Sequence, residues 1–152
     1  MVPSANNDSP IDDLEWPQAT CYWMAYSGGM DSTALLHMLA QKPDIKTKLR
    51  AIHINHQINP DADQWAQNCQ YFCDELGVPL TIATVDLPDH SENSCRQARL
   101  EVYRQHVQPE DCLITAHHQN DQVETLLFRL LRGTGLNGLT GMEQLSSFDH
   151  YT

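Results

Sequence analysis

The stretch Tyr26-Ser27-Gly28-Gly29-Met30-Asp31-Ser32 decides how the rest of the chain is interpreted. It follows an apolar run, Cys21 to Ala25, that predicts a buried strand, and it precedes Thr33 to Leu39, which predicts a helix. Glycines at such a turn let the main chain approach a ligand closely. The N–H groups of the first helical turn have no partners inside the helix. The stretch therefore predicts an anion site that suits phosphate.

The side chains of this turn refine the prediction. Ser27 and Ser32 add hydroxyl donors, whereas Asp31 cannot attract a phosphate by charge, so we assign it to a magnesium ion or to an orienting role. The stretch lacks the lysine of the Walker-type loop. The alternative is a Ser/Gly turn in front of a capped helix. Six residues in pattern, between a strand and a helix, favour the nucleotide loop.

Composition limits the classes of protein that the chain can belong to. Its 152 residues are enough for one domain, and its formal net charge is −11, from 9 Lys and Arg against 20 Asp and Glu. That charge opposes a strong nucleic-acid footprint on this domain by itself. Met1 to Pro17 lacks the pattern of a signal peptide, and no apolar run reaches membrane-spanning length, so we expect a cytoplasmic protein without a membrane partner. The five cysteines include no Cys-x-x-Cys pair, which favours reduced thiols.

The hydrophobic pattern divides the chain into a flexible N-terminal segment, residues 1–18, and one domain, residues 19–152. Strands and helices alternate along that domain, which predicts an α/β fold with a doubly wound parallel sheet and helices on both faces. Ligands of such sheets lie beyond the carboxyl ends of the strands. The expected strands cover about 21–26, 49–54, 80–85 and 111–116, and the expected helices cover about 33–41, 59–76, 92–107 and 119–132.

Polar residues follow the second and fourth expected strands. His53, Asn55 and His56 stand beside the loop and suit the adenosine side of a nucleotide site, although single polar residues at strand ends are more often merely solvated. His117 precedes Asp121 and Glu124, and carboxylates beside imidazoles suit magnesium binding, capture of an amine or proton transfer. The alternative for this second cluster is the solvated face of an amphipathic helix.

Two further stretches carry weaker signals. Glu92, Arg96 and Arg99 share one helix face, where an exposed ion pair would explain them equally well. The Gly-rich stretch from Gly133 to Gly141 is as typical of a linker as of a functional loop.

Together these stretches resemble the tRNA(Ile)-lysidine synthetase family, in its N-terminal ATP-pyrophosphatase (PP-loop) domain. The resemblance covers about Cys21 to Met142. The loop alone marks the superfamily, and the later segments are more specific. The matching segments are Ser27–Ser32, His53–His56, Ala62-Asp63 with Cys69, the Glu92/Arg96/Arg99 helix, Thr115–Thr125, Arg132–Gly135 and Gly138–Met142.

The resemblance implies a reaction. ATP adenylates the 2-oxo group of the cytidine at the first anticodon position of a minor isoleucine tRNA, and free lysine then attacks that carbon and expels AMP. ATP and Mg²⁺ are the implied cofactors, tRNA(Ile) and free L-lysine are the implied substrates, and a homodimer is left open. The implied site residues are Asp31, His117, Asp121 and Glu124 for catalysis, Ser27, Gly28, Gly29, Met30, Asp31, Ser32, His53 and Asn55 for ATP, Glu92, Arg96, Arg99, Arg132, Gly133 and Gly135 for substrate, and Asp31 and Asp121 for metal.

The sequence departs from the family at two positions. Asn120 stands where the family usually has an Asp, and Leu100 replaces a usual Tyr. We also expect the domain to be truncated at its C-terminal end, so that the chain binds ATP but does not make lysidine alone. Two other functions stay open. One is a tRNA thiolase with the same loop, which would generally need catalytic cysteines, and the other is an ATP-binding module without catalysis.

Overall fold

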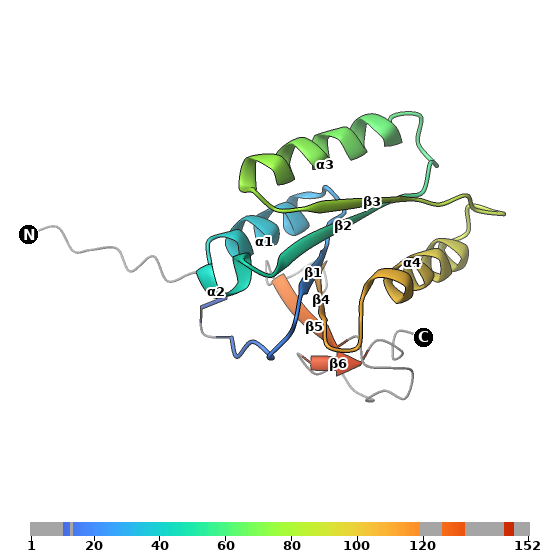
Figure 1. Ribbon diagram of the computed structural model, residues 1–152. Helices are drawn as coiled ribbons and strands as arrows, with labels where there is room; N and C mark the ends of the chain where they lie inside the picture. The colour runs from blue at the N-terminus through green and yellow to red at the C-terminus, as the bar shows by residue number, and fades with distance from the viewer. Residues whose placement is uncertain (1–10, 13, 119–125, 133–144, 148–152) are drawn as a thin grey trace, which may run out of the picture.

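The structure is a computed structural model that describes residues 11–12, 14–118, 126–132 and 145–147. Strands and helices alternate from the loop onward, and Figure 1 shows them as one sheet with helices on both sides. In chain order the elements are β1 (Tyr22–Ala25), α1 (Met30–Ala40), α2 (Pro43–Lys46), β2 (Leu49–Asn55), α3 (Ala62–Leu76), β3 (Leu80–Thr84), α4 (Glu92–His106), β4 (Cys112–His118), β5 (Leu126–Arg132) and β6 (Leu145–Ser147).

The order of the strands creates a place for a ligand. The sheet runs β3-β2-β1-β4-β5-β6, and its first four strands are parallel, as the alternation of elements predicted. The chain leaves β1 toward β2 and β3, and α4 then carries it back to the other side of β1, where β4 pairs. The strand order therefore reverses between β1 and β4, which is where doubly wound sheets bind their ligands.

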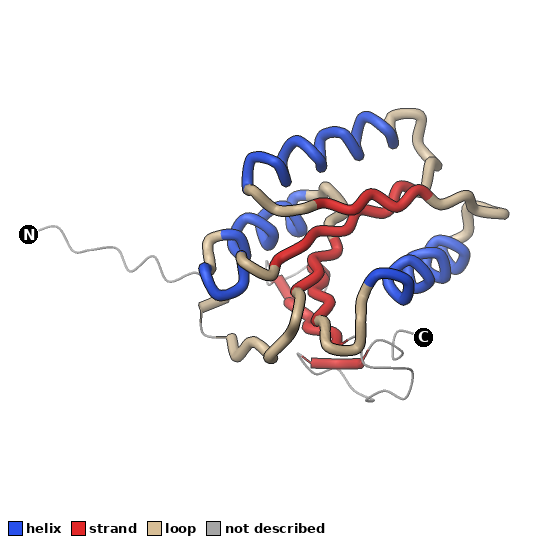
Figure 2. Tube along the Cα trace, in the orientation of Figure 1, coloured by secondary structure: helices blue, strands red, loops and turns tan. Residues whose placement is uncertain are grey.

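Alternate side chains of the central strands enter two separate cores. Tyr22 and Met24 of β1 pack on the face that α1, α2 and α3 cover, whereas Trp23 packs with Val102 of α4 on the opposite face. This alternation follows from the two-residue period of a strand. Figure 2 shows the strands in red with helices on either side, so both faces of the sheet are covered, as expected for parallel strands.

The structure corrects the prediction of the last helix. Residues 126–132 were expected at the end of a helix over 119–132, with Leu126, Leu127, Leu130 and Leu131 facing the core, but they form β5. β5 pairs antiparallel with β4, from Cys112 opposite Arg132 to His118 opposite Leu126. A leucine-rich run of seven residues fits a buried strand as well as a helix by periodicity, and pairing satisfies the backbone groups along the edge of β4. Residues 119–125 of the expected helix lie outside the described residues.

The packed domain begins earlier than residue 19. Ile11 is completely buried, and Leu14 and Trp16 pack against the α1/α3 core, although all three lie in the segment that the sequence assigned as flexible. These residues cover the base of the domain beside Leu39 and Ile45, which belong to the same core. Within the part of the chain that the structure describes, no helix has the length and apolar character needed to cross a bilayer.

A buried carboxylate joins β1 to the turn before β4. Asp111 is 4% exposed and accepts hydrogen bonds from the backbone N–H groups of Cys21 (3.1 Å) and Gln108 (3.0 Å) and from Trp23 Nε1 (3.0 Å). Three donors on one carboxylate satisfy groups that would otherwise be buried without partners. Asp111 thereby fixes the amino ends of β1 and β4 side by side, at the opposite end of the sheet from the loop.

Replacing Asp111 by Ala is expected to lower the free energy of unfolding by about 2–3 kcal/mol, because it leaves the buried Trp23 indole N–H without an acceptor. Chemical denaturation followed by tryptophan fluorescence measures the change. The matched control is Asp86→Ala at an exposed position, for which we expect less than about 0.5 kcal/mol. Equal effects of the two substitutions would show that Asp111 does not hold the strands together.

Candidate functional site

The loop after β1 is held in a conformation that requires glycine at one position. Gly28 has φ +82°, in the left-handed region, and a Cβ built there would lie 2.6 Å from Trp65 Nε1 and 2.8 Å from Cys69 Sγ. Helix α3 therefore packs directly against the bare backbone of the loop. Gly29 has φ −73°, which any residue adopts, and a Cβ there would meet only Ser27 Oγ, at 3.3 Å. The sequence predicted both glycines for the approach of a ligand, and the structure adds that Gly28 is required by the protein itself.

The two serines of the loop are bonded to each other. Ser27 Oγ lies 2.9 Å from Ser32 Oγ, Ser32 Oγ donates to the carbonyl oxygen of Gly29 (3.2 Å), and the Gly29 N–H donates to Ser27 Oγ (3.2 Å). In this arrangement the hydroxyl protons are used inside the loop. Helix α1 has no side-chain cap at its N-terminus, so its first-turn N–H groups are the donors that the loop offers to an anion.

The loop opens on a cavity of about 360 Å³ at the carboxyl ends of β1, β2 and β4. A volume of this order accommodates a small ligand. Helix α4 supplies the wall opposite the sheet. The lining residues are Ala25, Tyr26, Ser27, Ser32, Ile52, His53, Ile54, His56, Arg99, Tyr103, Thr115 and Ala116. The walls are thus mostly apolar or aromatic, with polar groups gathered near the strand ends.

His53 connects β2 to the start of the loop. Its imidazole is 7% exposed, and Nδ1 lies 2.8 Å from the carbonyl oxygen of Tyr26. A carbonyl only accepts, so Nδ1 carries the proton and donates. His53 therefore fixes the last backbone group before the loop, in addition to lining the cavity.

Asn55 was expected beside the nucleotide but has another position. It is 4% exposed, donates from Nδ2 to Asp63 Oδ1 (2.9 Å) and accepts at Oδ1 from the N–H of Gln57 (3.0 Å). Gln57 has φ +54°, so the amide of Asn55 stabilises a strained turn between β2 and α3. Asn55 does not line the cavity, and a role for it in binding ATP stays a prediction.

Of the three α4 residues that were expected to bind substrate, one lines the cavity. Arg99 lines the cavity, whereas Glu92 is exposed at the first turn of α4 and Arg96 is half-buried, and neither is a lining residue. Arg99 lies two turns along α4 from Glu92, which places it over the strand ends. Its guanidinium brings positive charge to the cavity of a strongly acidic chain.

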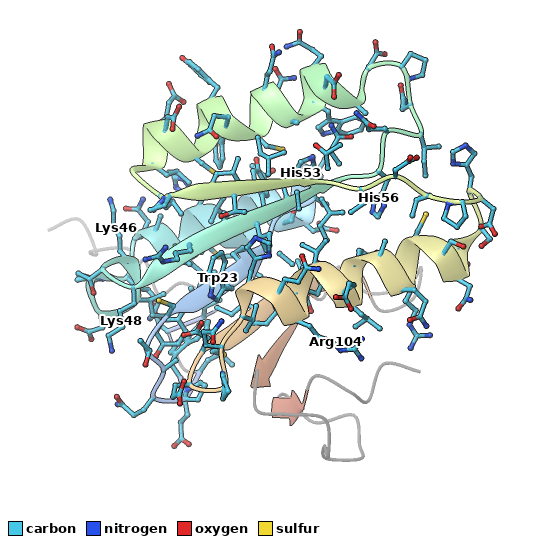
Figure 3. All side chains as sticks on the ribbon, turned by 45° about the vertical axis from the view of Figure 1, so that its right-hand side comes forward. Trp23, Lys46, Lys48, His53, His56 and Arg104 are labelled. Atoms are coloured by element: carbon cyan, nitrogen blue, oxygen red, sulfur yellow. The ribbon has the colours of Figure 1, made fainter. Side chains whose placement is uncertain are left out.

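The cavity includes two further polar residues: His56, which the sequence placed with His53 and Asn55 beside the loop, and Thr115, to which the sequence gave no role of its own. His56 follows β2 directly, and Figure 3 shows it at the strand end on the side of α4. Burial lowers the pKa of His56, and the neighbouring charges of Arg99 and His53 lower it further, so its imidazole is neutral at pH 7. Thr115 is 9% exposed on β4. His56 Nδ1 and Thr115 Oγ1 are the buried side-chain polar atoms without a hydrogen-bond partner among the described residues.

Comparison with known proteins is consistent with this geometry. The model of the PP-loop domain, an ATP-binding family, matches residues 5–152. The chain belongs to the PP-loop domain family.

Three curated relatives from different bacteria are all named tRNA(Ile)-lysidine synthase. A tRNA(Ile)-lysidine synthase of Pseudomonas putida is 47% identical over 136 residues, which are 87% of this chain and 32% of the relative. The corresponding enzyme of Haemophilus influenzae is 43% identical over 140 residues, 88% of this chain and 33% of the relative. The enzyme of Actinobacillus pleuropneumoniae is 38% identical over 139 residues, which are 90% of this chain and 32% of the relative. The chain thus spans about a third of the length of these relatives.

The remaining predicted residues are not among the described lining of the cavity or lie outside the described residues. Met30 is 87% exposed, and Asp31 lies in the first turn of α1; neither lines the cavity. His117 lies near the carboxyl end of β4, whereas Arg132 pairs with Cys112 at the opposite end of that strand. Asp121, Glu124, Gly133 and Gly135 lie outside the described residues. Among the described residues, no three His, Cys, Asp or Glu side chains gather as a metal site.

Gly28→Ala is expected to lower the free energy of unfolding by about 2–3 kcal/mol, because the methyl group adds left-handed strain and overlaps Trp65 and Cys69. Gly29→Ala, the matched control, should cost about 1 kcal/mol or less, since its φ is ordinary and Ser27 Oγ can move. Denaturant titration of both variants gives the comparison. Equal stability of the two variants would contradict the packing of α3 against the PP-loop.

Proposed function

We propose that this chain is the ATP-binding, cytidine-activating part of a tRNA(Ile)-lysidine synthase. ATP would adenylate the anticodon cytidine of tRNA(Ile), and free lysine would then displace AMP. The observation that carries the proposal is the PP-loop, which opens on a cavity at the point where the strand order reverses. The 47% identity to the Pseudomonas putida enzyme supports the choice of reaction within the family.

The described residues fit ATP. The uncapped N-terminus of α1 provides N–H donors for phosphate, and the apolar part of the cavity provides room for a nucleoside. Thr115 Oγ1, a buried polar atom that lacks a hydrogen-bond partner among the described residues, leaves the cavity a group to which a ligand can bond.

The loop would contribute to catalysis by stabilising the leaving group. When the α-phosphate is attacked, negative charge grows on the pyrophosphate, and fixed N–H dipoles aimed at that charge lower the barrier. Arg99, on the far wall, would orient the phosphate or the incoming RNA through its planar guanidinium. Mg²⁺, when bound with the phosphates, would neutralise part of their charge. Asp31 and Asp121 are the residues proposed to hold it.

The buried cysteines argue against the thiolase alternative. Burial raises the pKa of Cys69 to about 11 and that of Cys73 to about 12, so both remain protonated thiols at neutral pH. A thiolate is the reactive form of cysteine. These two thiols pack under the PP-loop as part of the core, where they serve as small apolar side chains.

The charge of the chain affects how the proposal is tested. A tRNA is bound largely through Lys and Arg contacts to its phosphates, and this chain has a net charge of −11. We therefore expect the chain alone to bind ATP but to incorporate little lysine. Joined to the remainder of the Pseudomonas putida relative, in place of the matching residues, it should be active.

The experiment measures incorporation of labelled lysine into tRNA(Ile) by that chimaera. Ser32→Ala should reduce incorporation about tenfold or more, since it removes a hydroxyl from the phosphate site, whereas Thr47→Ala, at an exposed position, should leave it unchanged. A chimaera that binds tRNA and ATP yet attaches no lysine would contradict the proposed reaction. Incorporation by the chain alone at the rate of the chimaera would contradict the role given to charge.

A further inference from the structure

The cavity contains two polar atoms that no described residue of the protein bonds. Thr115 Oγ1 and His56 Nδ1 are buried without a hydrogen-bond partner in that part of the chain, and both residues line the cavity. By contrast, three other polar residues of the cavity have partners: Ser27 and Ser32 bond to each other within the loop, and His53 bonds to the carbonyl oxygen of Tyr26. Buried polar groups normally have partners, so two exceptions in one cavity indicate a missing ligand.

The two atoms lie on opposite sides of the central strand. Thr115 belongs to β4 and His56 follows β2, and both strands pair with β1, which leads into the PP-loop. Ser27 and Ser32 line the same cavity and mark the end that faces phosphate. A ligand that reaches both the loop and the two unpartnered atoms therefore has phosphates at one end and a polar, uncharged group at the other.

The walls between these ends suit a flat ring. Ile52, Ile54 and Ala116 line the sheet side, and Tyr103 lines the side of α4. No carboxylate belongs to the described lining, so the ammonium groups of free lysine find no counter-charge there. His56 is neutral because burial, Arg99 and His53 all lower its pKa, so one of its ring nitrogens donates and the other accepts.

We propose that Thr115 Oγ1 and His56 Nδ1 are the hydrogen-bonding groups that hold the nucleoside half of ATP, while the PP-loop holds the phosphate half. This inference rests on the proposed ATP site and assigns two residues outside the loop to it. The two residues are binding residues for the nucleoside and have no part in binding pyrophosphate.

The test separates the two halves of the ligand by calorimetry with ATP, adenosine and pyrophosphate as probes. Thr115→Val, which keeps the shape of the side chain, should weaken ATP and adenosine about three- to tenfold, as loss of one neutral hydrogen bond does. It should leave pyrophosphate unchanged. Ser32→Ala should do the reverse, weakening ATP and pyrophosphate and leaving adenosine unchanged. Thr115→Ser, which keeps the hydroxyl, is the matched control and should bind adenosine like the parent.

His56 has its own pair of variants. His56→Asn keeps a polar atom near the position of Nδ1 and should retain most of the adenosine affinity, whereas His56→Phe removes it and should lose about three- to tenfold. Cytidine and free lysine should not displace adenosine from the parent protein. Stronger displacement by cytidine than by unlabelled adenosine would overturn the assignment of this cavity to ATP.

Stability gives a readout that a merely structural role would not produce. Removing an unpartnered buried hydroxyl should raise the melting temperature of ligand-free Thr115→Val while its adenosine affinity falls. If Thr115→Val and His56→Phe bind adenosine and ATP like the parent, this inference is wrong and the proposed ATP site stands. If the parent binds neither ATP nor pyrophosphate, the proposed function and this inference both fail.

Discussion

The contact between helix α3 and the backbone of Gly28 determines how the site is built. Gly28 adopts a left-handed conformation, and the Trp65 indole and Cys69 thiol occupy the space where a side chain would be. On the other side of the sheet, α4 forms the far wall of the cavity. The loop is therefore supported by the α1/α3 core and opens toward the α4 side. A ligand meets a backbone whose direction is set before it binds, which is the arrangement that electrostatic stabilisation requires.

Parallel strands bring chemically different groups to one edge of the sheet. The carboxyl ends of β1, β2 and β4 supply the loop serines, the His53–Tyr26 hydrogen bond and the Thr115 hydroxyl. Asp111 fixes β1 against the turn before β4 at the opposite edge of the sheet. The residues at the carboxyl ends of these strands are therefore not needed to hold the strands together. At the functional edge, Thr115 Oγ1 and His56 Nδ1 have no hydrogen-bond partner within the part of the chain that the structure describes. Buried polar groups without partners destabilise the ligand-free fold, and they are retained where a bound ligand forms the missing hydrogen bonds.

Much of the fold could be predicted from the sequence because its signals are local. Glycines, helix starts and apolar alternation located four strands and three long helices to within a few residues. The helix predicted over residues 126–132 was wrong, because the apolar residues from Leu126 to Arg132 fit the period of a strand as well as that of a helix. The segment forms a strand because it pairs with β4, and such long-range pairing is not visible in the local sequence. The short helix α2 was not predicted, although Pro43 stands at its first position, where the fixed φ of proline suits the start of a helix.

The site was predictable in its motif and less so in its walls. The PP-loop and His53 were expected in the site from pattern and position, and Arg99 from the family resemblance. Ser27, Ser32, His53 and Arg99 all line the cavity. Asn55 has the right position but turns out to hold Asp63 and Gln57, because burial decides which partners an amide reaches. His56 was expected beside the loop from its place after β2. Thr115 carries a signal only in three dimensions, where its buried hydroxyl lines the same cavity as His56 Nδ1 and neither atom has a hydrogen-bond partner among the described residues.

We expect one ATP molecule to lie with its phosphates on the PP-loop and its nucleoside between the strand ends and α4. The decisive measurement is a crystal structure of the chain with a non-hydrolysable ATP analogue. It should show phosphate oxygens on the N–H groups of residues 29–32 and the nucleoside beside Tyr103, within hydrogen-bond distance of Thr115 Oγ1 or His56 Nδ1. Phosphates on the loop with the nucleoside on the α3 side, against Trp65, would contradict it.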